Sequence, residues 1–211
     1  MNRKLLIALP KGRLLDQSIE LMGKAGIYVT PGDGSRLLFI EDRDKLFRFV
    51  MLKPVDIPVY VESGVIDAGI CGSDILRELD SDVNEPLDLQ IGHCALVAAG
   101  PADKEVSYRR NIHVATKYPR TAARFFKGKN AHVHIVKLDG SVEIAPLLGL
   151  ADVIVDLVET GRTLRDNGMR VIEEIAPVSA KLIVNRTAMK TKAQQVNNLI
   201  SQFDRVVYAN T

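Results

Sequence analysis

Short hydrophobic runs alternate along the chain with segments in which apolar residues recur every three or four positions. The first run, at residues 5–9, is followed by a segment with one apolar face at 14–24, which predicts a strand and then a helix. The same alternation continues to a predicted strand near 180–185 and a predicted helix at 188–207. Because parallel strands are usually joined by helices, this order predicts an α/β fold with parallel sheets covered by helices on both faces.

The pattern also predicts the elements between these ends. Strands are expected at residues 36–40, 46–52, 67–71, 87–91, 94–99, 112–116, 132–138, 152–158 and 170–175. Helices are expected at residues 56–61, where Asp56 would be the cap, and at 74–79, 119–127, 142–149 and 162–167.

The composition is that of a soluble globular protein. The chain has 211 residues, of which 46% are hydrophobic, and this is enough for a core in one large or two small α/β domains. Lys and Arg number 28 and Asp and Glu number 26, so the net charge of +2 gives no general attraction to nucleic acids or membranes. Any anion site must therefore be built locally.

Cysteine and histidine usage excludes other classes of site. Cys71 and Cys94 both lie in apolar runs, which argues against a disulfide scaffold. His132 and His134 share one face of a predicted strand, but no third ligand is suitably spaced, so no protein metal site is expected. The basic and then apolar N-terminus is interrupted at Pro10 before a signal peptide can develop, and a cytoplasmic location is predicted.

The most informative segment is residues 153–164, where a hydrophobic run ends in Asp156 and Glu159 and leads at once into Thr160-Gly161-Arg162-Thr163. A buried strand would fix the two carboxylates at its end, and free N–H groups of the following turn can hold an anion. The carboxylates can accept hydrogen bonds from vicinal hydroxyl groups. This combination predicts a site for a ribose 5-phosphate group.

A second candidate anion site is the segment Lys11-Gly12-Arg13. The predicted strand ends just before it, Gly12 permits a tight turn, and the next helix would point its N-terminus at whatever Lys11 and Arg13 approach. This arrangement favours a di- or triphosphate, and a solvated basic turn is the alternative. The segment is not a Walker A loop, because the upstream glycine and the Lys-Ser/Thr pair are absent.

Three further positions leave a functional and a structural interpretation open. Asp74, which follows Gly72 and Ser73, could hydrogen-bond a nucleotide amine or sugar, although Ser or Asp there more often caps a helix. Glu143 could bind a ligand, or could cap the next helix together with Ser141. Arg36 follows a glycine-rich turn and could clamp a phosphate or be a surface charge.

Two segments separated by 85 positions resemble each other. Residues 64–74 and 149–159 both place Gly-x-x-Asp before a hydrophobic strand, with an acid seven residues after that Asp. The repeat predicts two similar α/β lobes that present loops at the carboxyl ends of their strands, with a cleft between the lobes. Chance similarity between two helix–turn–strand units is the alternative.

Five segments in register resemble the ATP phosphoribosyltransferase family, which opens histidine biosynthesis. They are Leu9-Pro-Lys-Gly-Arg-Leu14, Asp56-Ile-Pro-Val-Tyr-Val-Glu-Ser-Gly64, Asp67-Ala-Gly-Ile-Cys-Gly-Ser-Asp74, Gly140-Ser-Val-Glu143 and Asp156-Leu-Val-Glu-Thr-Gly-Arg-Thr-Leu164. Each motif alone is modest, but their order and spacing extend through nearly the whole chain. The length resembles the short form of the family, which lacks a C-terminal regulatory domain.

The resemblance implies a two-lobed fold like that of the type II periplasmic binding proteins, with the active site between the lobes. Residues 1–92 and 178–211 would form lobe I, and residues 93–177 would form lobe II, which would bind phosphoribosyl pyrophosphate. In lobe II, Asp156 and Glu159 would lie near the ribose hydroxyls, and Thr160, Gly161, Arg162 and Thr163 would surround the 5-phosphate. The implied ATP site comprises Lys11, Gly12, Arg13, Gly72, Ser73, Asp74 and Glu143. Arg13 and Arg36 would be the catalytic cations.

The implied reaction is attack by adenine N1 of ATP on the anomeric carbon of phosphoribosyl pyrophosphate, with release of pyrophosphate. N1 carries a lone pair and no proton, so catalysis would depend on positioning and on cations that stabilise the leaving group. Mg²⁺ would be held mainly by the substrates' phosphates. The alternatives are a phosphoribosyltransferase that uses another base and a non-catalytic solute-binding module.

The resemblance also implies partners. Short forms assemble with a regulatory subunit that resembles histidyl-tRNA synthetase and senses histidine. We therefore expect a homodimer within a hetero-oligomer, and we expect the isolated chain to be insensitive to histidine.

Overall fold

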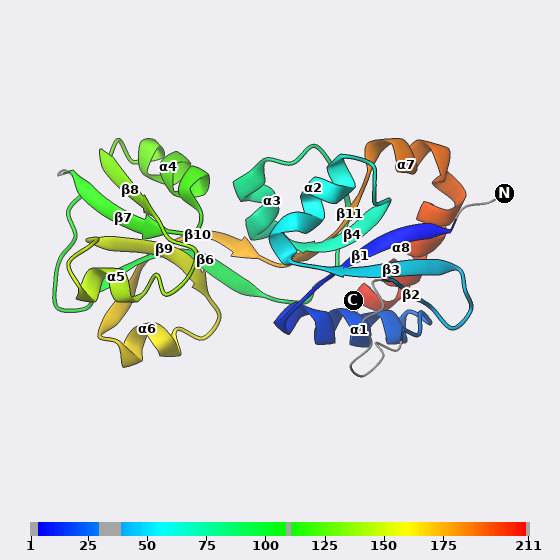
Figure 1. Ribbon diagram of the computed structural model, residues 1–211. Coiled ribbons are helices and arrows are strands. Elements are labelled where there is room, and N and C mark those ends of the chain that lie inside the picture. Colours follow the sequence, from blue (N-terminus) through cyan, green and yellow to red (C-terminus); the bar gives the residue numbers. More distant parts are fainter. Residues whose placement is uncertain (1–3, 30–38, 109–110, 210–211) are drawn as a thin grey trace. The chain divides into compact units, whose positions relative to one another are not determined.

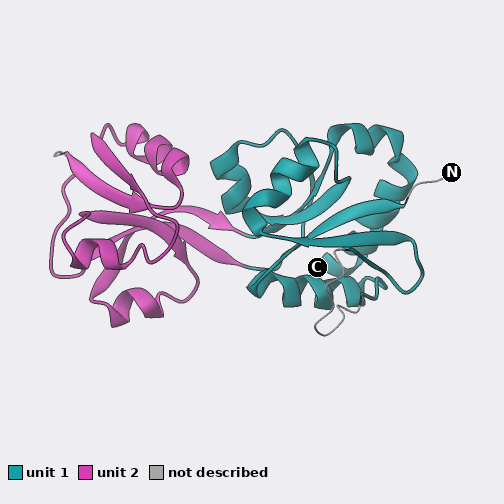
Figure 2. Cartoon of the chain, in the orientation of Figure 1, with its two compact units in different colours: residues 1–92, 179–211 teal, residues 93–178 magenta. Residues whose placement is uncertain are grey.

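The computed structural model describes residues 4–29, 39–108 and 111–209. The chain divides into two compact units, which Figure 2 colours separately: unit 1 is residues 1–92 with 179–211, and unit 2 is residues 93–178. Each unit has its own sheet and its own helices (Figure 1). The second crossing between units lies between Val178 and Ser179, one residue later than the boundary expected from the sequence.

Unit 1 is built on a six-stranded sheet with the order β2-β3-β1-β4-β11-β5. The strands are β1 (Leu5–Pro10), β2 (Phe39–Glu41), β3 (Phe47–Leu52), β4 (Ala68–Gly72), β5 (Asn84–Asp88) and β11 (Ala180–Val184). The helices are α1 (Arg13–Lys24), the 3₁₀ turn η1 (Pro54–Asp56), α2 (Ile57–Glu62), α3 (Ser73–Leu79), α7 (Arg186–Thr191) and α8 (Ala193–Val207). Alternate residues of β1 enter opposite cores, since Ile7 packs with α1 and α8 while Ala8 packs with α2 and α3.

Unit 2 is built on a five-stranded sheet with the order β10-β6-β9-β7-β8. The strands are β6 (Cys94–Pro101), β7 (Ile112–Thr116), β8 (Val133–Lys137), β9 (Val153–Val158) and β10 (Met169–Val178). The helices are α4 (Pro119–Gly128), α5 (Ile144–Leu147) and α6 (Arg162–Asp166). Phe126 of α4 belongs to one core cluster and Leu164 of α6 to another, so this sheet is also covered on both faces, as expected.

Three expectations about the elements are corrected. The sheets are mixed: β1 is parallel to β3 and β4, and β7 is parallel to β8 and β9, but β2, β5, β6, β10 and β11 make antiparallel pairs. Residues 42–46 between β2 and β3 are too few for a parallel crossover. The expected helix at 188–207 is two helices that are separated at Lys192. Asp56 precedes α2, but its side chain makes no capping hydrogen bond.

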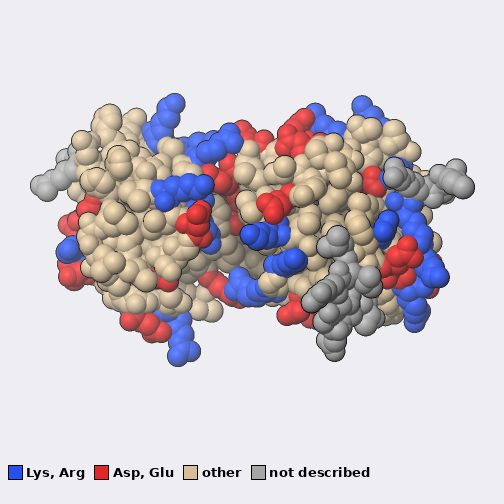
Figure 3. Space-filling model, viewed as in Figure 1, with Lys and Arg blue, Asp and Glu red and all other residues tan. Residues whose placement is uncertain are grey.

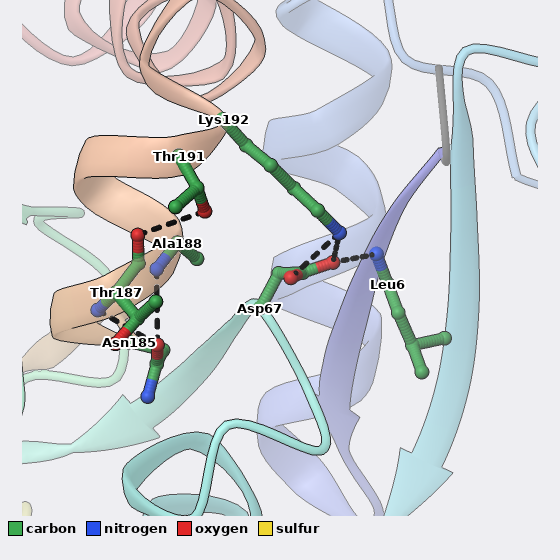
Figure 4. Close-up of polar contacts among 7 residues, drawn as sticks. All are labelled: Leu6, Asp67, Asn185, Thr187, Ala188, Thr191 and Lys192. Atoms are coloured by element: carbon green, nitrogen blue, oxygen red, sulfur yellow. Dashed lines mark hydrogen bonds and ion pairs between the residues drawn. The ribbon is translucent and has the colours of Figure 1, made fainter. Parts of the chain in front are cut away.

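The repeated Gly-x-x-Asp segments have the same conformation in both units. Gly64 and Gly149 have positive φ angles of 77° and 74°. Asp67 N donates to Leu6 O at 3.0 Å. Figure 4 shows the bond in the other direction, in which Leu6 N donates to Asp67 Oδ2 at 2.9 Å. Asp152 makes the equivalent pair with His113, at 2.8 Å in both directions. The repeat is therefore structural, and in each unit it joins two neighbouring parallel strands.

Candidate active site

The candidate ATP residues of unit 1 lie on the edge of the sheet where β1, β3 and β4 end. Lys11 N donates to Leu52 O at 2.8 Å, which fixes the turn between β1 and α1 against the end of β3. Gly12 has a φ of 89°, a conformation that a side chain would strain. Lys11 and Arg13 are exposed, and Figure 3 shows Lys and Arg side chains gathered over the end of unit 1 where α1 begins.

Gly72 ends β4, and Ser73 and Asp74 begin α3 on the same edge, because β4 is the parallel neighbour of β1. Asp74 is only 6% exposed, and its carboxylate folds back over Gly72, where an added Cβ would lie 2.2 Å from Asp74 Oδ1. Gly72 is the capping residue of α3, so neither Ser73 nor Asp74 occupies the N-cap position. A side chain at position 72 would therefore displace the Asp74 carboxylate.

Ser73 connects this edge to the segment that returns from unit 2. Its N–H donates to Ser179 O at 2.9 Å, and its hydroxyl accepts from Ser179 N at 3.3 Å. Ser179 Oγ and Lys181 Nζ in turn donate to Asp88 Oδ2 at 2.8 and 2.6 Å. Burial alone would raise the pKa of Asp88, but Lys181, the backbone N–H of Gln90 and Ser179 together outweigh it, and the pKa is lowered. Residues 179–181, with which the chain returns to unit 1, are thereby held at the edge of the sheet that carries the candidate ATP residues.

Cys71 lies at the end of β4 and is fully buried. Burial raises the pKa of its thiol strongly, and the carboxylates of Asp74 and Glu85 raise it further. The thiol therefore stays protonated at neutral pH, and it is not a candidate nucleophile.

The candidate phosphoribosyl residues of unit 2 lie where β7, β8 and β9 end. Asp156 is in β9, and its Oδ1 accepts a hydrogen bond from Leu157 N at 2.8 Å and lies 3.0 Å from Lys117 Nζ. Glu159 is exposed in the turn that follows. The predicted strand with two acids at its end is therefore confirmed, although only Asp156 is within the strand.

The turn after β9 presents backbone groups at the start of α6. Gly161 precedes this helix in a left-handed conformation, with a φ of 70°. Thr160 Oγ1 accepts from Arg162 N at 3.4 Å, which closes the turn. Arg162 lies along the helix, with Nε 3.5 Å from Asp166 Oδ2 in an exposed pair, and Leu164 anchors the helix in the core. Thr163 is exposed on the first turn.

Glu143 lies in the loop after β8, at the same edge of the unit 2 sheet. It directly precedes α5, but neither Ser141 nor Glu143 caps this helix with its side chain, so the capping alternative is wrong here. Val142 between them is buried and holds the loop in the core.

The structure therefore brings the candidates together in two groups, one at the carboxyl edge of each sheet. Arg36 lies outside the described residues. Lys53 and Lys117 were not singled out from the sequence, yet each is the first residue after a parallel strand, β3 and β7, at a candidate edge. A lysine immediately after a predicted strand was the signal that could have found them.

Two features are absent from the described residues. Across these residues, no three His, Cys, Asp or Glu side chains gather as a possible set of metal ligands. No helix of the described chain has the length and apolarity needed to cross a membrane.

Comparison with known proteins matches nearly the whole chain. The family model HisG, described as ATP phosphoribosyltransferase, matches residues 53–205. The chain is 52% identical over 202 residues to the ATP phosphoribosyltransferase of Thermoanaerobacter sp. (strain X514), with 95% of each chain covered. It is 43% identical over 212 residues to that of Geobacter metallireducens, covering 98% of this chain and 100% of the relative.

Solved structures give the same result and extend it to the fold. A structure of the HisG:HisZ complex of ATP phosphoribosyl transferase from Thermotoga maritima matches with a TM-score of 0.85 and 32% identity, covering 98% of this chain and 100% of that one. The periplasmic aliphatic sulphonate binding protein SsuA from Escherichia coli matches with a TM-score of 0.61 at 12% identity, covering 96% of this chain and 68% of that one. The second likeness concerns the fold alone and confirms the predicted periplasmic-binding-protein-like architecture.

The motifs from Leu9 to Leu164, the two-unit α/β fold and these matches agree with one another. The chain belongs to the ATP phosphoribosyltransferase family, whose reaction transfers a phosphoribosyl group to ATP in the first step of histidine biosynthesis.

Proposed function

We propose that the two sheet edges divide the substrates, so that the unit 2 edge binds phosphoribosyl pyrophosphate and the unit 1 edge binds ATP. The observation that carries the first assignment is the position of Asp156, whose carboxylate is fixed at the end of β9, just before the Thr160–Thr163 turn. Asp156 and Glu159 would accept hydrogen bonds from the ribose hydroxyls. The backbone N–H groups and hydroxyls of Thr160, Gly161, Arg162 and Thr163 would hold the 5-phosphate.

On the unit 1 edge, cations would bind the polyphosphate groups. Lys11 and Arg13 are exposed at the start of α1, a helix of 12 residues whose N-terminus favours negative charge. Gly12 would let the backbone approach a phosphate closely. Arg36 is proposed as a further cation at this site. Gly72, Ser73 and Asp74 would supply further ATP contacts on this edge. Glu143, which lies in unit 2, would be an additional ATP contact from that unit.

The chemistry needs positioning more than acid–base catalysis. Adenine N1 attacks the anomeric carbon with its lone pair while the bond to pyrophosphate breaks, so negative charge grows on the leaving group. Arg13 and Arg36 would stabilise that charge, which is the kind of electrostatic contribution that dominates many enzymatic rate enhancements. The carboxylates would orient the ribose, so that N1 and the anomeric carbon meet in line.

Mg²⁺ enters the proposal as a counter-ion of the substrates. This ion prefers hard oxygen ligands and keeps several waters, so the phosphates of ATP and phosphoribosyl pyrophosphate would provide most of its coordination. Its chemical contribution would be to neutralise phosphate charge. The protein itself would supply few ligands.

Regulation would come from a second protein. The Thermotoga maritima relative was solved as a HisG:HisZ complex, and we propose that this chain, as a homodimer, binds a HisZ-type, histidyl-tRNA-synthetase-like subunit in the cytoplasm. Feedback by histidine would then be absent from the pure chain and would appear when that subunit is added. Inhibition of the pure chain by histidine would contradict this arrangement.

Pyrophosphate release tests the assignment of substrates. The purified chain is incubated with Mg²⁺, ATP and phosphoribosyl pyrophosphate, and with each substrate alone. We expect release only with both substrates, and an Asp156→Asn variant should show a raised KM for phosphoribosyl pyrophosphate and an unchanged KM for ATP. Release without ATP but with a free base would favour a different acceptor, and an unchanged KM in Asp156→Asn would remove Asp156 from the site.

A further inference from the structure

Lys117 lies beside Asp156 because of the register between β7 and β9. β7 and β9 are parallel neighbours, and Thr116 is paired with Val155. The next residues, Lys117 and Asp156, therefore lie side by side at the ends of the paired segments. Lys117 Nζ lies 3.0 Å from Asp156 Oδ1, and the two side chains are 37% and 23% exposed. The pair therefore lies at the proposed phosphoribosyl edge, where a ligand can reach it.

The backbone on both sides of Lys117 is fixed by buried contacts. Thr116 is fully buried, donates its hydroxyl to Val155 O at 2.6 Å and accepts from Tyr118 N at 2.9 Å. Tyr118 is 5% exposed, and its ring centroid lies 5.2 Å from Lys117 Nζ. The lysine therefore extends from a rigid point, and its ammonium group is confined between an aromatic ring and a carboxylate.

The two oxygens of the Asp156 carboxylate have different environments. Oδ1 accepts from Leu157 N at 2.8 Å and pairs with Lys117, whereas Oδ2 has no hydrogen bond from any residue that the structure describes. Two contacts on one oxygen fix the plane of the carboxylate. The orientation of Oδ2 is thereby fixed as well, and this oxygen can accept a hydrogen bond from a ribose hydroxyl.

We propose that Lys117 is a positioning residue for phosphoribosyl pyrophosphate, which acts by holding the Asp156 carboxylate in the orientation that accepts the ribose. This inference deepens the proposed function and rests on it. Because the pair is partly exposed, its direct contribution to stability is small, and its main effect is on ligand binding.

Steady-state kinetics of Lys117→Met test the proposal. We expect KM for phosphoribosyl pyrophosphate to rise about tenfold, with KM for ATP unchanged and kcat within about twofold, since an orienting charged hydrogen bond is lost. Lys117→Arg should restore most of the affinity because it keeps the cation. Lys127→Met is the matched control, since it removes the same charge from an exposed position of α4 and should leave both KM values unchanged. If Lys117→Met does not fold, Lys117→Gln takes its place.

A double-mutant cycle separates positioning from other roles. If Lys117 acts through Asp156, the Lys117→Met, Asp156→Asn double variant should have a KM for phosphoribosyl pyrophosphate within about twofold of that of Asp156→Asn alone. Fully additive effects, or an unchanged KM in Lys117→Met beside a raised KM in Asp156→Asn, would overturn the role of Lys117. An unchanged KM in Asp156→Asn would instead overturn the proposed function on which this inference rests.

Discussion

Asp67 of unit 1 and Asp152 of unit 2 occupy equivalent places in the repeated segment, yet their surroundings differ. The side chain of Asp67 is 12% exposed, and both of its oxygens accept from Lys192 Nζ, at 2.8 and 2.7 Å (Figure 4). The side chain of Asp152 is 54% exposed, with His113 Nδ1 3.7 Å away. The same backbone arrangement therefore serves two purposes: in unit 1 it also holds the junction between α7 and α8 against the sheet, and in unit 2 it only joins two strands.

The edges at the carboxyl ends of the parallel strands, away from the repeated aspartates, have similar backbones in the two units but different side chains. In both units a parallel strand ends and a turn leads into a helix, but the turn after β1 presents Lys11 and Arg13, whereas the segment around the end of β9 presents Asp156 and Glu159. Under the proposed division of substrates, the basic turn of unit 1 would bind the phosphate groups of ATP. The two acids of unit 2 would bind ribose hydroxyls, beside the turn proposed to hold the 5-phosphate. The shared repeat accounts for the similar backbone of the two units, and the loops at the strand ends give each unit its own set of side chains.

The largest effect should follow removal of a cation from the unit 1 edge. We expect Arg13→Ala, and likewise Arg36→Ala, to lower kcat by about 10²–10³, the loss typical of one electrostatic donor to a transition state. Removing Asp156 from the unit 2 edge should instead act mainly on KM for phosphoribosyl pyrophosphate. Arg205→Ala removes the same charge from the exposed face of α8 and serves as the control. Unchanged turnover in both arginine variants would refute the assignment of charge stabilisation to unit 1.

Much of this arrangement could be predicted from the sequence, because the relevant signals are local. The run before Asp156 is apolar at every position and forms β9, and the 85-residue repeat identified the two equivalent aspartates. Gly12 was expected to permit a tight turn, and it has a positive φ, as does Gly161 in the predicted turn after Glu159. The family motifs then identified the reaction, which residue chemistry alone left open.

The remaining features depend on contacts between distant residues, which the pattern does not encode. The break at Lys192 arises where its side chain binds Asp67, 125 positions earlier. The antiparallel pairing of β11 with β4 depends on where the chain returns to unit 1. Lys117 follows a predicted strand, but only the register between β7 and β9 places it beside Asp156.

The next largest effect should be a difference in the free energy of unfolding between variants of the two repeated aspartates, Asp67 and Asp152. Asp67→Ala removes the partner of Leu6 N and leaves Lys192 without its carboxylate, so we expect a loss of about 2–4 kcal/mol. Asp152→Ala should cost only about 1 kcal/mol, because water can reach the groups that it leaves. Thermal and urea unfolding would measure the losses, and amide hydrogen exchange at Leu6 and His113 would locate them. Equal losses in the two variants would break the comparison between the units.

The smallest effect should be the same in both units, because it concerns only the shared backbone. Gly64 and Gly149 have φ angles of 77° and 74°, and a methyl group would meet only an ordinary 3.5 Å contact with Asn185 at the first and open space at the second. Gly64→Ala and Gly149→Ala should therefore each cost about 1 kcal/mol, from left-handed strain alone. Gly128→Ala, at the end of α4 with open space and no positive φ, is the control and should be neutral or slightly stabilising. A clear difference between the first two variants in urea unfolding would mean that the two turns are not mechanically equivalent, and the shared conformation would then no longer account for the repeat.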